Sequence, residues 1–163
     1  MTDPAAPSVL FVCLGNICRS PLAEGIFLHL AAERNLEGLV VDSAGTGGWH
    51  AGEGPDRRAS AVATKRGVHL PRRARQVERA DFERCTPIIA KAASNQENLL
   101  AMGAPENHVR LMRSYDPSYT KTNAPDVPDP YYGGDEGFDD VFDMLMTACT
   151  GLLDELIQNS PTR

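Results

Sequence analysis

The stretch Ser8-Val-Leu-Phe-Val-Cys13-Leu-Gly-Asn-Ile-Cys-Arg-Ser20-Pro21 decides the fold of this 163-residue chain. Its first six residues form a nearly continuous apolar run with β-branched side chains, which predicts a buried parallel strand. Gly15 and Asn16 then break the apolar pattern. Ser20 belongs to the residue types that cap helices, and Pro21 suits the first position of a helix. The stretch therefore predicts a strand, a short loop and a helix in direct succession.

The same alternation of strands and helices continues to the end of the chain. Apolar spacing carries the first helix to about Arg34. The other predicted strands are at 39–41, 87–90 and 109–112. The other predicted helices are at 56–66, after the capping-box signature at 94–97, and along the apolar face of 138–156. Strands alternating with helices predict a three-layer α/β/α fold with a small, four-stranded parallel sheet, flavodoxin-like in its arrangement. In such folds ligands bind at the carboxyl ends of the strands, and Cys13 ends the first strand.

Length and composition indicate a single globular domain over 8–163, preceded by a flexible N-terminal tail at 1–7. Hydrophobic residues make up 42% and charged residues 23%, which excludes a disordered or collagen-like chain. No apolar run approaches the roughly 18 residues that would span a bilayer. Residues 1–7 lack the basic and apolar regions of a secretory signal, so we expect a cytoplasmic protein without a membrane partner.

The charge balance argues against nucleic-acid binding, since the formal net charge is −6 and such proteins normally carry a basic excess. The charges are nevertheless unevenly placed. The middle of the chain is basic and contains Arg57, Arg58, Lys65, Arg66, Arg72, Arg73, Arg75 and Arg79. A later stretch is acidic and contains Asp126, Asp129, Asp135, Glu136, Asp139, Asp140 and Asp143. Such blocks are consistent with two solvated faces or with docking of a charged partner.

The four cysteines are too sparse for a disulfide scaffold and do not have zinc-site spacing, so no metal is expected. Two of them, Cys13 and Cys18, flank the loop after the first strand. A loop of this shape can turn several backbone N–H groups inward to bind an anion, and the following helix adds its positive end. Arg19 offers a planar fork that matches two phosphate oxygens, and the Ser20 hydroxyl could donate to the Cys13 sulfur.

We therefore expect Cys13 to be a thiolate nucleophile under a bound phosphate. The predicted phosphate-binding loop comprises Leu14, Gly15, Asn16, Ile17, Cys18 and Ser20. Neither a G-x4-G-K-[ST] loop nor a G-x-G-x-x-G motif occurs, which excludes the common nucleotide-binding loops.

The segment Cys13-Leu-Gly-Asn-Ile-Cys-Arg-Ser-Pro21 resembles the signature of the low-molecular-weight protein tyrosine phosphatases, and the resemblance extends over nearly the whole chain. Further matching landmarks are Ser43-Ala-Gly-Thr46 with Trp49, Arg73-Ala-Arg-Gln76, and Asp129-Pro-Tyr-Tyr-Gly133. The resemblance implies hydrolysis of phosphotyrosine in protein substrates through a phosphocysteine intermediate, without a cofactor. It also implies a monomer, with a cognate tyrosine kinase as a candidate partner.

The resemblance assigns roles by position. Cys13 is expected to be the nucleophile, Arg19 to bind the phosphoryl oxygens, and Asn16 and Ser20 to hold the loop. Asp129 is expected to be the general acid for the leaving phenol and then the general base for water. Pro130 independently keeps Asp129 out of the helical region, which suits a presented loop carboxylate.

Aromatic residues are expected to select the substrate. Trp49, Tyr131 and Tyr132 match the walls of the entrance, where they would stack on a phenyl ring. Ile17 resembles the tyrosine-specific branch, because related arginine phosphatases carry Thr at that position. The resemblance also makes Cys18 a redox partner of Cys13 under peroxide, while Cys149 has the spacing of a buried residue.

Three positions depart from the family pattern: Lys91-Ala92 stands in place of a frequent Met-Asp pair, Arg72 in place of a frequent His, and Cys85 in place of an aromatic residue. Two alternative functions remain. Arsenate reductases share the fold and loop but relay a disulfide through two further cysteines, and only Cys85 is suitably placed. A non-enzymatic phosphotyrosine-binding module would require a damaged nucleophile or acid, and both residues are present.

Overall fold

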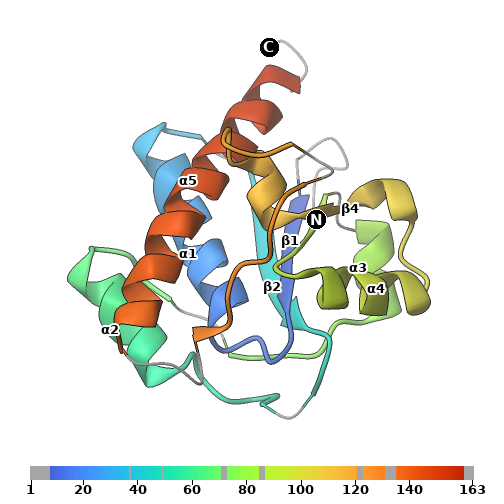
Figure 1. The fold of residues 1–163 in the computed structure, drawn as a ribbon, viewed down its shortest axis with the longest axis horizontal. Helices are drawn as coiled ribbons and strands as arrows, with labels where there is room; N and C mark the ends of the chain where they lie inside the picture. Colours follow the sequence, from blue (N-terminus) through green and yellow to red (C-terminus); the bar gives the residue numbers. More distant parts are fainter. Residues whose placement is uncertain are drawn as a thin grey trace.

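A computed structural model describes residues 8–36, 38–48, 50–70, 73–84, 87–120, 123–130 and 135–159. Four strands, β1 (Ser8–Cys13), β2 (Val40–Gly45), β3 (Ile88–Ala90) and β4 (Val109–Leu111), form one parallel sheet in the order β2-β1-β3-β4 (Figure 1). The predicted four-stranded parallel sheet is confirmed. Because β1 is a central strand, its carboxyl end lies in the middle of the sheet edge where ligands bind in such folds.

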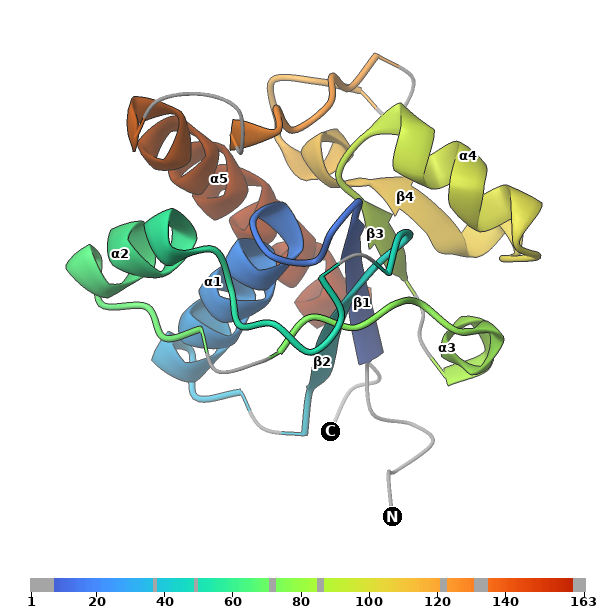
Figure 2. The same cartoon turned by 90° about the horizontal axis from the view of Figure 1, so that it is seen from below.

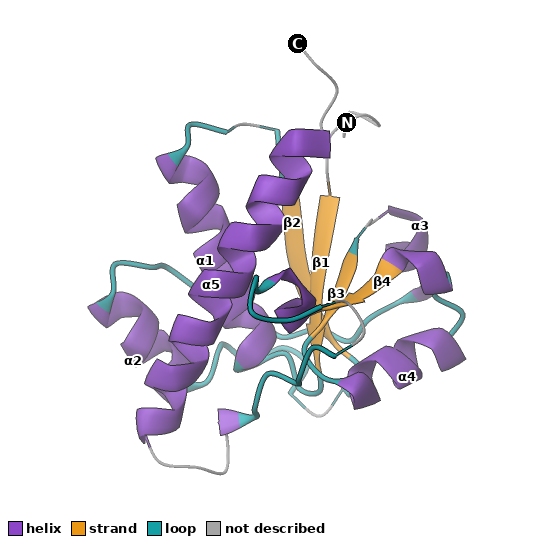
Figure 3. Cartoon of the chain, turned by 45° about the horizontal axis from the view of Figure 1, so that its top comes forward, coloured by secondary structure: helices purple, strands orange, loops and turns teal. Residues whose placement is uncertain are grey.

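Helices cover both faces of this sheet. Three helices, α1 (Arg19–Glu33), α2 (Arg57–Lys65) and α5 (Asp135–Asn159), lie on one side, and α3 (Arg79–Arg84) and α4 (Ala93–Ala101) lie on the other (Figures 2 and 3). Short 3-10 turns, Glu106–His108 and Met112–Tyr115, precede and follow β4. The three-layer arrangement agrees with the prediction. Helix α3 was missed, because six mostly charged residues carry little apolar periodicity.

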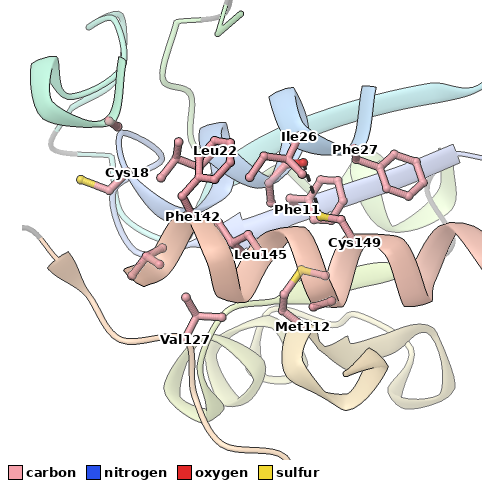
Figure 4. Close-up of a cluster of buried hydrophobic side chains, with 14 of the residues drawn as sticks. Phe11, Cys18, Leu22, Ile26, Phe27, Met112, Val127, Phe142, Leu145 and Cys149 are labelled. Atoms are coloured by element: carbon pink, nitrogen blue, oxygen red, sulfur yellow. Dashed lines mark hydrogen bonds between the residues drawn. The ribbon is translucent and has the colours of Figure 1, made fainter. Parts of the chain in front are cut away.

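The apolar run of β1 is explained by burial on both faces. Val9 and Phe11 join a large cluster with α1 and α5, in which Phe142, Leu145 and Cys149 face α1 (Figure 4). Leu10 and Val12 belong to a second cluster beneath α3 and α4. Alternate residues of a strand point to opposite faces, so a strand covered on both sides is apolar throughout.

Two predicted helix starts are wrong. Helix α1 begins at Arg19 with Cys18 at the capping position and no side-chain cap, since the Ser20 hydroxyl is engaged by Cys13 and Asn16 instead. Helix α4 begins at Ala93, one residue before the predicted signature, with Ala92 as its cap. A distant carboxylate satisfies its first turn, because Asp126 Oδ1 accepts the Ala93 N–H at 2.9 Å. A tertiary contact has therefore replaced the local cap of α4, whereas at α1 the expected capping hydroxyl is used by Cys13 and Asn16.

The basic and acidic blocks meet where α2 packs against α5. Arg66 pairs with Asp143 at 2.6 Å and Asp139 at 3.6 Å, and its guanidinium lies 4.6 Å from the centre of the Phe142 ring. Part of the uneven charge is therefore neutralised within the molecule. Among the described residues, no helix is both long and apolar enough to span a membrane.

Candidate active site at the end of strand β1

The segment after Cys13 folds back over the carboxyl end of β1 in a tight loop. Asn16 adopts φ 59°, a left-handed conformation that Asn tolerates better than most residues. Its backbone N–H donates to Cys13 Sγ at 3.3 Å. Gly45 at the end of β2 makes room for the loop, because a Cβ there would lie 2.7 Å from the Leu14 carbonyl oxygen. The loop thus folds back over the sulfur and turns the Asn16 backbone N–H toward it.

A buried hydrogen-bond network fixes the direction of the Ser20 hydroxyl. The Asn16 side chain is oriented by its Oδ1 atom, which accepts the Arg75 backbone N–H at 2.9 Å. Asn16 Nδ2 must then donate to the Ser20 and Ser43 hydroxyl oxygens, at 2.7 and 3.0 Å. With its oxygen accepting from Asn16, the Ser20 hydroxyl is free to donate to Cys13 Sγ at 3.0 Å. This geometry favours negative charge on the sulfur.

Ser43 and Glu24 complete the network, and sequence reasoning assigned neither a role. The Ser43 hydroxyl donates to Glu24 Oε1 at 2.6 Å, and both side chains are buried. Ser43 is the first residue of the Ser43-Ala-Gly-Thr46 motif, so the sequence did contain a signal for its importance. Glu24 lies four residues after Ser20 on α1, and a carboxylate on an apolar helix face was the only hint of its burial.

Arg19 and Asp129 come together at the mouth of the loop. The Arg19 guanidinium is buried, donates through Nη1 to the Val127 carbonyl at 2.9 Å, and lies 3.6 Å through Nη2 from Asp129 Oδ2. The Asp129 side chain keeps 35% of its surface exposed. A half-exposed carboxylate held beside the arginine that is expected to bind phosphate has the position required of a general acid.

Backbone bonds anchor the segment that presents Asp129 to the sheet. The Val127 N–H donates to the Lys91 carbonyl at 2.7 Å, and the Lys91 N–H donates to the Val12 carbonyl at 3.0 Å. Val127 itself is buried. The long loop before α5 is therefore fixed two residues before its carboxylate.

Cys18 lies in the same loop but has a different electrostatic environment from an activated thiol. Burial raises the pKa of Cys18 far above its ordinary value, and the nearby groups of Asp56, Cys13 and Asp129 raise it further. Arg58 opposes this shift. Cys18 is consequently a neutral thiol close to Cys13 and Asp129.

Helix α2 joins the site through Asp56, which sequence reasoning had not singled out. The Asp56 N–H donates to the Ile17 carbonyl at 2.7 Å, and its carboxylate caps α2 by accepting the Arg58 N–H at 2.8 Å. Ile17 is buried beside the loop. Asp after a Gly-Pro pair and before a polar helix was the available signal.

The expected substrate-recognition residues Trp49, Tyr131 and Tyr132 lie outside the described residues, as do Arg72, Cys85 and the tail at 1–7. His50 does lie at the loop, since a Cβ on Gly15 would be 3.0 Å from its Cδ2 atom. Cys149 is fully buried against α1, where its S–H faces the Ala23 carbonyl at 3.8 Å, and burial raises its pKa to about 12. Across the described ranges no cluster of three His, Cys, Asp or Glu residues is arranged to hold a metal.

Comparisons with known proteins agree over nearly the whole chain. A family model described as low molecular weight phosphotyrosine protein phosphatase matches residues 8–162. A low molecular weight protein-tyrosine-phosphatase of Streptomyces coelicolor is 46% identical over 149 residues, covering 89% of this chain and 90% of that protein. A crystal structure of a protein tyrosine phosphatase from Entamoeba histolytica has a TM-score of 0.88 at 35% identity, covering 96% of this chain and 100% of that one. A crystal structure of a Drosophila arginine phosphatase has a TM-score of 0.82 at 33% identity, covering 90% and 96%.

Proposed function

Because this chain belongs to the low-molecular-weight phosphotyrosine protein phosphatase family, we propose that Cys13, Arg19 and Asp129 carry out its reaction. The protein is a protein tyrosine phosphatase, a hydrolase that acts on phosphoproteins. The observation that carries the assignment is the hydrogen bond from Ser20 to Cys13 Sγ, next to Arg19, the first residue of α1, which is paired with Asp129.

The first step forms a bond between Cys13 Sγ and phosphorus as the bond from phosphorus to the tyrosine oxygen breaks. Ser20 and the Asn16 N–H stabilise the attacking thiolate. Arg19 offers two N–H groups to the equatorial oxygens, where charge builds up. Asp129 gives its proton to the leaving phenolate, so tyrosine departs neutral.

The second step hydrolyses the phosphocysteine. Asp129, now a carboxylate, takes a proton from a water molecule as that water attacks phosphorus. The bond from sulfur to phosphorus breaks, and the Cys13 thiolate and inorganic phosphate are regenerated. Asp129 suits both roles because its side chain is only half-buried and reaches both the site and solvent.

Cys18 is the redox guard of Cys13. Peroxide oxidises the Cys13 thiolate to a sulfenic acid, and attack by Cys18 then forms a disulfide with loss of water. As a neutral thiol, Cys18 does not compete as nucleophile in turnover. Thiol reduction is expected to restore peroxide-treated native protein but not the Cys18→Ala variant; equal recovery would remove this role.

The substrate is phosphotyrosine rather than phosphoarginine, although the likeness to an arginine phosphatase makes the second activity a candidate. Ile17 supports the choice, since an apolar side chain packed beside the loop favours a phenyl ring over a guanidinium. Trp49, Tyr131 and Tyr132 complete the aromatic entrance in this proposal. One phosphatase domain over 8–163 acts as a cytoplasmic monomer opposite a cognate tyrosine kinase.

Hydrolysis of matched phosphotyrosine and phosphoarginine peptides tests the function directly. We expect turnover of the first, little of the second, and no change on adding EDTA. Cys13→Ser is expected to abolish hydrolysis while retaining phosphate binding. Full activity in that variant, or a preference for phosphoarginine, would overturn the assignment.

A further inference from the structure

Lys91 is the first residue after β3, and its ammonium is enclosed in the core. The residue is 1% exposed. Its Nζ atom lies 3.1 Å from Met112 Sδ and 4.2 Å from the centre of the Phe11 ring. The described part of the chain gives it no carboxylate or carbonyl acceptor. A thioether and an aromatic face compensate only part of the free energy that burying a lysine ammonium costs. The presence of a lysine at this buried position therefore requires an explanation.

Strand register places this ammonium beneath the phosphate-binding loop. Val12 pairs with Ala90 across β1 and β3, so Cys13 and Lys91 occupy the next rung. Cys13 lies two residues after Phe11 on the same face of β1, and the Lys91 side chain contacts the Phe11 ring on that face. Neighbouring strands of a sheet lie about 4.8 Å apart. Lys91 is therefore a direct neighbour of the nucleophile, on its buried side.

Among the described residues, Cys13 is the one group facing Lys91 that can supply a negative charge. Cys13 faces it from β1, Arg19 from α1 and Cys149 from α5. Arg19 is positive. Cys149 is kept neutral, because burial raises its pKa to about 12. When Lys91 is protonated, its counter-charge is therefore expected at Cys13 or on a phosphate bound above it.

We propose that Lys91 is a positioning residue whose buried ammonium stabilises the Cys13 thiolate and a dianion bound in the loop. The inference rests on the proposed roles of Cys13 and Arg19. It adds the positive charge of Lys91 below the loop to the positive charge of Arg19 beside the loop. In the dry interior this charge acts through a lower effective dielectric than a surface lysine would, so its influence is larger at the same distance. Exposed Lys65 on α2 provides the contrast.

Protonation of Lys91 then makes anion binding sensitive to pH. Burial lowers the pKa of Lys91 to about 7; Cys149 and Cys13 raise it, and Arg19 lowers it. The ammonium is present below that pH and is lost as pH rises through it. Dianion affinity is therefore expected to weaken across neutral pH. His50 also lies against the loop at Gly15, so the effect of Lys91 is measured with and without the His50 side chain.

The test compares Lys91→Met with the native protein and with the matched control Lys65→Met. Met has a similar length and no charge, so the core stays filled. The first readout is the pH dependence of inactivation by iodoacetate, which reports the thiolate without requiring phosphatase activity. We expect its midpoint to rise by about one pH unit in Lys91→Met and to stay unchanged in Lys65→Met.

The second readout is competitive inhibition by sulfate, which remains a dianion over this pH range. At pH 6 we expect Lys91→Met to bind sulfate about tenfold more weakly, a difference that disappears by pH 9, also in a His50→Gln background. A folded Lys91→Met with the native iodoacetate midpoint and native sulfate inhibition would refute the inference. If the native protein hydrolyses phosphotyrosine peptides in the same series of assays, the proposed function is supported even when the inference about Lys91 is refuted. If Lys91→Met does not fold, Lys91→Gln takes its place with the same expectations.

Discussion

Asn16→Ala is expected to destabilise the fold and to impair catalysis through the same network. The alanine removes the amide that holds three partners, at 2.7 Å to Ser20, 3.0 Å to Ser43 and 2.9 Å to the Arg75 N–H. Each net hydrogen bond is worth about 1 kcal/mol, so their loss costs about 3 kcal/mol. Alanine at φ 59° adds about 1 kcal/mol of backbone strain, which gives a total near 4 kcal/mol.

Asn35→Ala is the matched control, because Asn35 has φ 56° and is exposed at the end of α1. That variant loses only the backbone preference and is expected to cost about 1 kcal/mol. Asn16→Gly supplies the complementary test: it relieves the strain but not the lost bonds, and is expected to cost about 3 kcal/mol.

Urea unfolding at pH 7 measures all three variants, and kcat/KM on p-nitrophenyl phosphate measures the catalytic effect. We expect kcat/KM to fall at least about tenfold in Asn16→Ala and Asn16→Gly, since the Ser20 hydroxyl loses the bond that directs it to Cys13. Asn35→Ala is expected to keep native activity. If Asn16→Ala and Asn35→Ala lost equal stability, the network would contribute nothing measurable and the reasoning would be refuted.

Three further predictions concern single ionisable groups. Asp129→Ala is expected to lower kcat by about 10²–10⁴-fold and to remove one pH limb of the rate profile, which steady-state kinetics over pH would show. Buried Asp81 has its pKa lowered: burial opposes the shift, but hydrogen bonds from Arg75, the Glu78 N–H and Arg84 outweigh it. Asp81→Asn is therefore expected to cost about 3 kcal/mol at neutral pH. That difference should begin to fade in urea titrations as pH falls below about 4, where the carboxyl of the unfolded chain takes up a proton first. It should be gone once pH has also fallen below the lowered pKa of the native carboxyl. Lys91→Met is expected to be more stable than the native protein by a few kcal/mol below pH 7, where the native protein buries a charged lysine. The gain should shrink as pH rises toward 10.5, because the lysine of the unfolded chain then also loses its proton. Thermal melts at pH 6 and pH 10 measure the difference.

The strand-loop-helix unit at Ser8–Pro21 was correctly predicted from sequence for local reasons. An apolar run buried on both faces, a loop with Gly15 and Asn16, and a proline in the first turn of the helix each act within a few residues. The strands and helices that follow Pro21 alternate along the chain, and this alternation predicted the parallel sheet. The proposed nucleophile, Cys13, and Arg19 lie within one seven-residue segment, so their proximity could be predicted without the tertiary structure.

Helix starts and the short α3 were not predictable in the same way. The capping signal at Ser20 was overridden by Cys13 and Asn16, which engage its hydroxyl in the folded loop. The signal at Ser94 was overridden by Asp126, a partner distant in sequence. A hydroxyl bonds whichever partner the fold brings near, and sequence spacing contains no record of that choice.

Sequence by itself predicted the reaction chemistry of this protein, because Cys13 at the end of β1 and Arg19 and Ser20 at the start of α1 are separated only by one short loop. Tertiary structure alone decided what surrounds that loop. Strand order put Lys91 on the rung beside Cys13, helix packing buried Glu24 behind Ser43, and the anchored Val127 brought Asp129 to Arg19 across 110 positions of sequence. Local chemistry follows from neighbours along the chain, whereas the field around a nucleophile depends on charges that only folding brings close and removes from water.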